Sequence, residues 1–229
     1  MPGLAFDGGL AVALQPVGSR AAEGSEAAAS GVLSPAEQER ARAMAPQARV
    51  AFVSRRLAQR TFAAALLDVP PSALQACYSC PNCGAGVEVA HGRPGYLLDG
   101  VPAPLLLSVS QAGGWFLLAA LLDAPVGMAL GADLEHVDGT LFPGFDGVAL
   151  TEAERRRVQG LPLEVRDLER TRLWARKEAW LKMTGSGLRS RPEDLDVLER
   201  PGLADLDLGQ WRSVGLPTGF AAAIAVTGP

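Results

Sequence analysis

Lysine is nearly absent from this 229-residue sequence: Lys177 and Lys182 are the only lysines among 21 lysine and arginine residues. A lysine kept in such an arginine-rich chain is expected to act as a compact point charge, a role that the planar guanidinium does not fill, and chance retention is the alternative. Histidine is equally scarce, and neither His91 nor His136 lies in a recognisable nucleophilic constellation. The sequence therefore points away from covalent catalysis by a Ser-His-Asp or Cys-His set.

Long apolar runs are also lacking. The most apolar stretch, Trp115–Leu122, has eight residues, whereas a membrane-spanning helix needs roughly 20. The N-terminal residues show no basic segment typical of a signal peptide, and three cysteines cannot all pair within the chain. A net charge of −4 argues against broad electrostatic binding of nucleic acid. We expect a cytoplasmic, soluble protein without a membrane or nucleic-acid partner.

The first half of the chain carries clear signals for helices and a hairpin. Residues 17–31 are small and polar and predict a loop, after which Ser34 and Glu37 form the capping box of a new helix. A second helix is predicted over residues 50–67. Two strands, at 105–110 and 115–122, follow a turn-rich region and are joined by a glycine-containing turn.

The second half repeats this order of signals. The N-cap signatures at residues 32–37 and 149–154 are 117 positions apart, and the helical stretches at 57–60 and 173–176 are 116 apart. Matched offsets predict an internal duplication. We expect an α+β fold of two similar α+β halves, residues 1–124 and 125–229, with a site in the cleft between them.

A third helix is predicted over residues 168–184, ended by Gly185. Its helical wheel places Lys177 in the middle of an apolar stripe that includes Leu173 and Trp180. A lysine there is costly unless it meets an anion or faces a cleft. The alternative is that its ammonium group reaches past the apolar surface to solvent.

Two acidic residues, Asp133 and Glu135, follow apolar strand-like sequence. On a strand they would point to the same face, where two carboxylates suit Mg²⁺, although solvated acids on an exposed face are the alternative. Glu178 and Lys182 form an i,i+4 pair on the predicted helix. Together, these acidic residues and lysines are the side chains that metal-assisted chemistry on a pyrophosphate requires.

These motifs resemble those of the Sfp-type, pseudo-dimeric 4′-phosphopantetheinyl transferases. The family signature G-[IV]-D-[IV]-E is matched by G-A-D-L-E at 131–135, and W-x-x-K-E-[AS]-x-x-K-x-x-G-x-G-L by residues 174–188. G-R-P at 92–94 and S-V-S-Q-A-G at 108–113 match two upstream family motifs, the second in degraded form. The resemblance covers roughly residues 32–198 and implies two similar α+β halves with the active site between them.

The resemblance implies a reaction and residue roles. A serine of an acyl or peptidyl carrier protein would attack coenzyme A (CoA), take the phosphopantetheine arm and release 3′,5′-ADP. The implied metal ligands for Mg²⁺ are Asp133, Glu135 and Glu178. Glu178 and Lys182 would act in catalysis, Glu178 by activating the serine. The implied CoA contacts are Arg49, Arg93, Ser110, Gln111, Lys177 and Lys182, and a structural role is the alternative for Lys177.

Two positions depart from the family pattern. Gln111 stands where the family has histidine, and Ser108 stands where it has asparagine. A glutamine donates a hydrogen bond to phosphate but carries no charge. We expect weakened or retuned coenzyme binding. The alternative function is that of a catalytically impaired relative that binds CoA or a carrier protein.

A cysteine cluster lies outside these motifs. Cys77, Cys80 and Cys83 are evenly spaced, and His91 follows eight residues later. Cys₃His is an accepted structural zinc set, although three reduced thiols are the alternative.

Carrier domains are usually acidic, so a local basic patch should receive them, and the candidates are residues 155–157 and 166–176. The duplication also favours a monomer, because the second half supplies what a partner subunit would.

Overall fold

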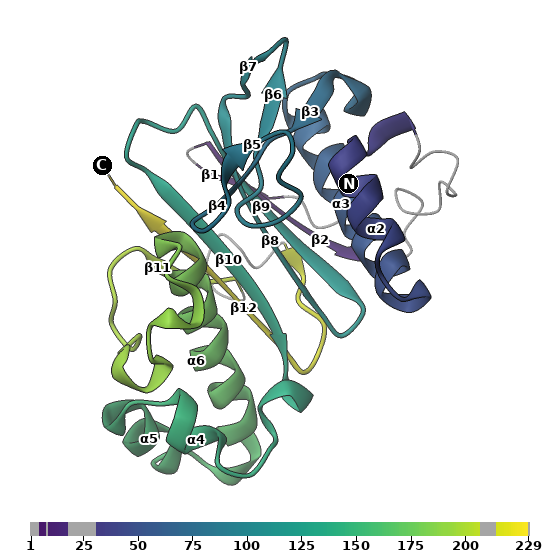
Figure 1. Cartoon of the computed structure of the whole chain (residues 1–229). Helices are drawn as coiled ribbons and strands as arrows, with labels where there is room; N and C mark the ends of the chain where they lie inside the picture. The colour runs from purple at the N-terminus through teal and green to yellow at the C-terminus, as the bar shows by residue number, and fades with distance from the viewer. Residues whose placement is uncertain (1–4, 8, 18–30, 207–213, 229) are drawn as a thin grey trace.

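Two antiparallel sheets share one apolar core and lie between two long helices (Figure 1). The computed structural model describes residues 5–7, 9–17, 31–206 and 214–228, so the predicted loop at 17–31 lies almost wholly outside the described residues. The first sheet has the order β1-β2-β9-β8 and the second the order β10-β12-β11. The strands are β1 (Ala5–Asp7), β2 (Leu10–Pro16), β8 (Leu105–Ala112), β9 (Trp115–Leu122), β10 (Ala129–His136), β11 (Leu203–Asp205) and β12 (Phe220–Thr227).

The continuous apolar run of β9 is explained by burial on both faces. Phe116 and Leu118 pack into the core beneath helix α3 (Pro46–Leu66). Leu117 and Ala119 point the other way and pack against the second sheet. Successive side chains of a strand alternate between faces, so a strand between two apolar layers needs apolar residues at every position. The predicted hairpin of β8 and β9 is confirmed.

The helix signals of the first half are confirmed with shifted bounds. Helix α2 (Pro35–Arg42) begins with the predicted capping box, in which Ser34 and Glu37 exchange hydrogen bonds. Helix α3 starts four residues before the predicted position, because Pro46 occupies its first turn and no side chain caps it. Sequence signals are weakest at such uncapped starts.

Helix α6 (Leu163–Thr184) ends at Gly185, as predicted, where the backbone is left-handed with φ 70°. It lies on the second sheet in very close contact with β10. A Cβ on Gly131 would stand 2.0 Å from the carbonyl oxygen of Ala179 and 2.5 Å from the amide nitrogen of Met183. Glycine at the first position of the G-A-D-L-E motif therefore sets how closely β10 approaches α6.

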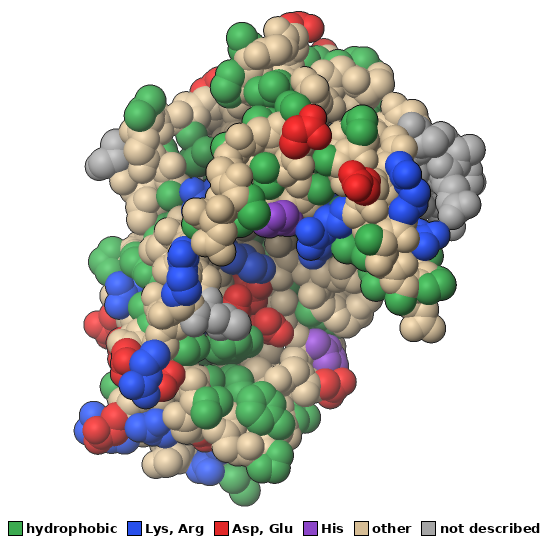
Figure 2. All heavy atoms as spheres, viewed as in Figure 1, with side chains coloured by type: hydrophobic (Ala, Val, Ile, Leu, Met, Phe, Trp, Pro, Cys, Tyr) green, Lys and Arg blue, Asp and Glu red, His purple; other side chains and the backbone are tan. Residues whose placement is uncertain are grey.

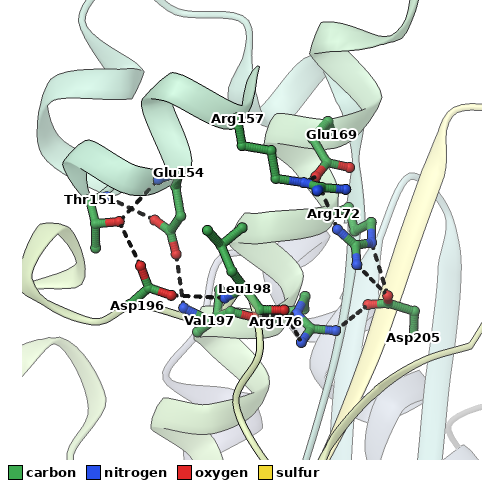
Figure 3. Close-up of polar contacts among 10 residues, drawn as sticks. All are labelled: Thr151, Glu154, Arg157, Glu169, Arg172, Arg176, Asp196, Val197, Leu198 and Asp205. Carbon is green, nitrogen blue, oxygen red and sulfur yellow. Dashed lines mark hydrogen bonds and ion pairs between the residues drawn. The ribbon is translucent and has the colours of Figure 1, made fainter. Parts of the chain in front are cut away.

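The outer face of α6 carries α4 (Phe145–Ala149) and α5 (Glu152–Gln159) together with the segment that leads to β11. Figure 3 shows the polar contacts that hold this segment to the helix. Arg176 donates to the carbonyl oxygen of Val197 at 2.8 Å and pairs with Asp205 at 3.1 Å. Arg172 pairs with the same Asp205 at 2.8 Å. This network ties α6 both to the end of β11 and to the segment that leads to it.

A smaller β region covers the first half. It comprises β3 (Leu74–Ala76), β4 (Tyr78–Cys80), β5 (Gly84–Gly86), β6 (Tyr96–Leu98) and β7 (Val101–Pro102). The short 3-10 helices are η1 (Pro71–Ala73), η2 (Val137–Thr140), η3 (Gly187–Arg189) and η4 (Pro192–Asp194). Among the described residues, no helix has the length and apolar character to cross a bilayer.

Candidate active site

Six of the predicted site residues line one cavity of about 500 Å³. They come from three elements: the end of β8, the middle of β10 and the last turns of α6. They are Ser110, Gln111, Asp133, Glu135, Glu178 and Lys182. Figure 2 shows a hollow on this face in which acidic and basic side chains gather, with a histidine at its edge.

Lys182, Asp133 and Ser110 form a polar triangle at the floor of this cavity. The Lys182 Nζ atom lies 2.6 Å from Asp133 Oδ1 and 3.0 Å from Ser110 Oγ. The Ser110 hydroxyl donates in turn to Asp133 Oδ1 at 2.7 Å. Asp133 is almost fully buried, whereas one third of the Lys182 side chain is exposed. The ammonium group therefore faces the cavity while its partner stays fixed beneath it.

Glu135 and Glu178 are held in an environment that disfavours their negative charge. Burial and, next, the neighbouring Asp133 carboxylate raise the pKa of Glu135 to about 8, with Lys182 opposing both. Burial also raises the pKa of Glu178, again reinforced by Asp133 and opposed by Lys182. One lysine therefore does not neutralise three carboxylates in this cavity.

These residues fit a hard divalent cation. The buried Asp133 Oδ2 atom receives no hydrogen bond within the described part of the chain. An orphaned carboxylate oxygen beside two acids of raised pKa is a set of oxygen ligands that Mg²⁺ accepts. Within the described residues, the three carboxylates are not close enough for one oxygen of each to lie within 4.8 Å of the other two. They suit an ion that takes most of its ligands from water and phosphate, as Mg²⁺ does.

A second cavity of about 790 Å³ adjoins the first, and both are lined by Val109 and Lys182. Arg93 and Arg189 add their positive charges to that of Lys182. The Arg93 guanidinium donates to the carbonyl oxygens of Lys182 and Met183, at 3.1 and 2.7 Å. Arg93 thus closes the C-terminal end of α6 and also borders the cavity.

A third, basic hollow of about 170 Å³ lies beside Val109 on the other side. Arg55 lines this hollow and the acidic cavity as well. Its guanidinium forms no hydrogen bond or ion pair with the described residues, and burial, followed by the charge of Arg56, lowers its pKa. The other charged or titratable lining residues are Arg40, Arg56 and His91.

Part of the second half is similar to a known protein family. Residues 129–213 match the model of the 4′-phosphopantetheinyl transferase superfamily. The match begins with β10 and includes the whole of α6, so it contains Asp133, Glu135, Glu178 and Lys182. It supports transfer of phosphopantetheine as the general activity, with CoA as the donor that this superfamily uses. A search of the curated proteins found no match.

Two of the predicted CoA contacts, Lys177 and Arg49, line none of these three cavities. Lys177 is fully buried, paired with Glu154 at 2.7 Å, and donates to two backbone carbonyls of the segment at 192–195. Its ammonium group does not reach solvent, because Lys177 faces α5, where Glu154 covers it. Arg49 donates to the carbonyl oxygens at the end of α2, at 3.0 to 3.3 Å. Its charge caps that helix.

Sequence reasoning overlooked Arg55. It lies six residues after Arg49 on α3, and the available signal was an arginine within the helical stretch that begins with the apolar residues 50–53. Ser108, the other departure from the family pattern, lies next to the site and joins β8 to β10. The Ala132 amide donates to its hydroxyl at 2.8 Å.

The predicted carrier-binding patch is largely neutralised within the chain. Arg157 pairs with Glu169, Arg170 with Asp146, and Arg172 and Arg176 with Asp205. Arg156 pairs with Glu152 at 3.9 Å on the surface of α5, and 72% of its side chain is exposed.

Proposed function

We propose that this protein is a Mg²⁺-dependent 4′-phosphopantetheinyl transferase of the Sfp type, which modifies a serine of an acyl or peptidyl carrier protein. The observation that carries the proposal is the single cavity in which Ser110 of the first half meets Asp133, Glu178 and Lys182 of the second. Phosphoryl transfer needs mainly positioning and charge neutralisation, which this set supplies.

The chemistry follows from the charges in the cavity. The serine oxygen attacks the β-phosphorus of CoA, the bond from that phosphorus to the bridging oxygen breaks, and 3′,5′-ADP leaves. Glu178 accepts the serine proton, because it is the acid on α6 that lines the cavity opposite the strand acids. Lys182 stabilises the negative charge on the phosphate oxygens, to which its exposed ammonium group has access.

Asp133, Glu135 and Glu178 are the residues that would hold Mg²⁺. Bound there, the ion would neutralise the pyrophosphate of CoA as a Lewis acid. A positive charge at this position also favours the ionised form of Glu178, which the base role requires. Asp133 contributes a fixed ligand, since Lys182 and Ser110 hold one of its oxygens and leave the other free.

CoA itself would extend over the three adjoining hollows around Val109. Arg93 and Arg189 border the largest, and Arg55 borders the basic one. Their guanidinium groups match the phosphates of the nucleotide end, because arginine binds phosphate oxygens through paired N–H donors. Gln111 lies exposed at the rim of the acidic cavity and would donate a neutral hydrogen bond.

We also propose that residues 1–124 and 125–229 arose by internal duplication. The support is a repeated polar contact: Glu37 pairs with Arg60 in the first half, and Glu154 pairs with Lys177 in the second. Positions 37 and 154 differ by 117, and so do positions 60 and 177. Because both halves line the acidic cavity, a monomer would contain the complete site.

The decisive experiment is intact-mass spectrometry of an apo carrier protein incubated with this protein, CoA and Mg²⁺. We expect a gain of one phosphopantetheine group, abolished by EDTA and reduced at least about a hundredfold in rate by Glu178→Gln. Glu152→Gln, which changes an exposed glutamate of α5, is the matched control and should retain the full rate. CoA binding without any mass gain across several carrier types would reject the transferase in favour of a binding module.

A further inference from the structure

A cluster of metal-binding side chains lies beside the second cavity, outside the acidic site. The ligand atoms of Cys80, Cys83 and His91 all lie within 4.8 Å of one another. It is the one such group of three or more in the part of the chain that the structure describes. Cys77, the fourth member of the sequence pattern, does not belong to it.

The backbone explains why these side chains converge. Cys80 ends β4, and a tight turn brings Cys83 back before β5, which pairs with β4. Ser79 and Arg93 exchange backbone hydrogen bonds of 3.0 and 2.8 Å, which place His91 next to the turn. Gly92 permits this approach, since a Cβ there would lie 2.2 Å from the carbonyl oxygen of Ser79.

The donor set indicates the metal. Two thiolates and an imidazole are the ligands that Zn²⁺ takes in proteins, at C-x₂-C spacing. We propose that Cys80, Cys83 and His91 bind one zinc ion, with water as the fourth ligand. The exposure of Cys83 leaves that fourth position open to solvent.

Zinc here would cross-link a region that has little hydrophobic core of its own. The turn between β4 and β5 is mostly exposed, so few apolar contacts hold it. Cys80 and Arg93 nevertheless border the same 790 Å³ cavity. Binding of zinc would therefore fix one wall of that cavity and, with it, the position of Arg93. The effect on CoA rests on the proposed function, whereas zinc binding does not.

The test is the metal content of the chain, purified without chelator from zinc-supplemented medium. We expect about one zinc per chain, falling below about a tenth in Cys83→Ser and in His91→Asn. Cys77→Ser is the matched control and should keep its zinc. Replacement by Co²⁺ should give the thiolate-to-cobalt charge-transfer absorption in the wild type and in Cys77→Ser, and should lose it in Cys83→Ser.

Several outcomes would overturn the assignment. Absence of zinc from the wild type would overturn the metal site, and a Cys80–Cys83 disulfide in protein purified without reductant would replace it by a redox pair. Loss of zinc from Cys77→Ser would overturn the three-ligand set. If zinc stabilises this region, its removal by a chelator that is then exchanged for buffer with Mg²⁺ should lower the unfolding temperature and raise the KM for CoA more than it lowers kcat. An unchanged unfolding temperature after complete zinc removal would reject this stabilising role.

Discussion

Lys177 and Glu154 form an ion pair that is fully buried, with Lys177 Nζ 2.7 Å from Glu154 Oε2. Glu154 is also the third residue of a capping box, in which it exchanges hydrogen bonds with Thr151. Its other oxygen accepts from the Val197 amide at 3.0 Å (Figure 3). One carboxylate thus ties together the start of α5, the middle of α6 and the segment that leads to β11.

Replacing Lys177 should therefore cost stability rather than substrate affinity. Lys177→Met leaves a buried charge without its partner, and we expect the free energy of unfolding to fall by about 3–5 kcal/mol. The double variant with Glu154→Gln should recover part of this loss. Urea denaturation measures both, with Arg156→Met on the exposed surface of α5 as the control. A raised KM for CoA with unchanged stability would return Lys177 to the role of a ligand.

Gly131→Ala should destabilise the protein by about 1–3 kcal/mol, because its methyl group would overlap the backbone of α6. The shift would also move Asp133, two residues along β10, so transfer activity should fall in the fraction that folds. Gly147→Ala is the matched control, since a Cβ on Gly147 meets no atom within 4 Å. Equal stability of the two variants would show that β10 can move away from α6 at little cost.

The elements near the site were predictable because their signals are local. Capping boxes at Ser34 and Thr151 and the apolar run of β9 depend on residues within a few positions. The shared face of Asp133 and Glu135 follows from the period of a strand. These features needed no knowledge of how distant segments pack.

The failures involve partners that are remote in sequence. A helical wheel shows that Lys177 lies within an apolar stripe, but its partner Glu154 belongs to another helix. Arg49 and Arg55 both lie on α3, but Arg49 caps α2 whereas Arg55 lines the cavity beside β8. The sequence does not show which of the two packs against which element. Cys77 shares the cysteine spacing, yet its backbone pairs with Gly95 and its thiol stays outside the cluster.

The metal-free protein should lose stability as the pH rises from about 4.5 to about 8. Glu135 has a pKa of about 8 in the folded chain, against an ordinary value of 4.5, so the folded state binds more protons throughout that range. Mg²⁺ should reverse this loss and release a proton on binding near neutral pH. Thermal unfolding across this range with and without Mg²⁺, and calorimetry in two buffers, test both. A pH-independent effect of Mg²⁺ would place the ion elsewhere.

Arg55 and Arg49 provide a comparison within one helix. Arg55→Gln removes a guanidinium that borders two cavities, so we expect the KM for CoA to rise about tenfold or more, the value of one charge-assisted hydrogen bond. Arg49→Gln should leave this KM unchanged and lower the free energy of unfolding by about 1 kcal/mol, because it loses contacts to α2. The reverse pattern would restore the sequence-based assignment of Arg49.

Gln111 should respond to substitution in a pH-dependent way. The glutamine lies exposed at the rim of the acidic cavity, where its amide can donate a hydrogen bond to a phosphate oxygen without adding charge. Histidine at this position gains a positive charge as the pH falls through about 6.5. Gln111→His should therefore lower the KM for CoA, and the difference from the wild type should widen between about pH 7.5 and pH 6, while Gln111→Ala should raise it. Steady-state kinetics at the two pH values measure these constants. If Gln111→His left KM and kcat unchanged at both pH values, residue 111 would contact no phosphate. The expectation that glutamine in place of histidine weakens coenzyme binding would then be wrong.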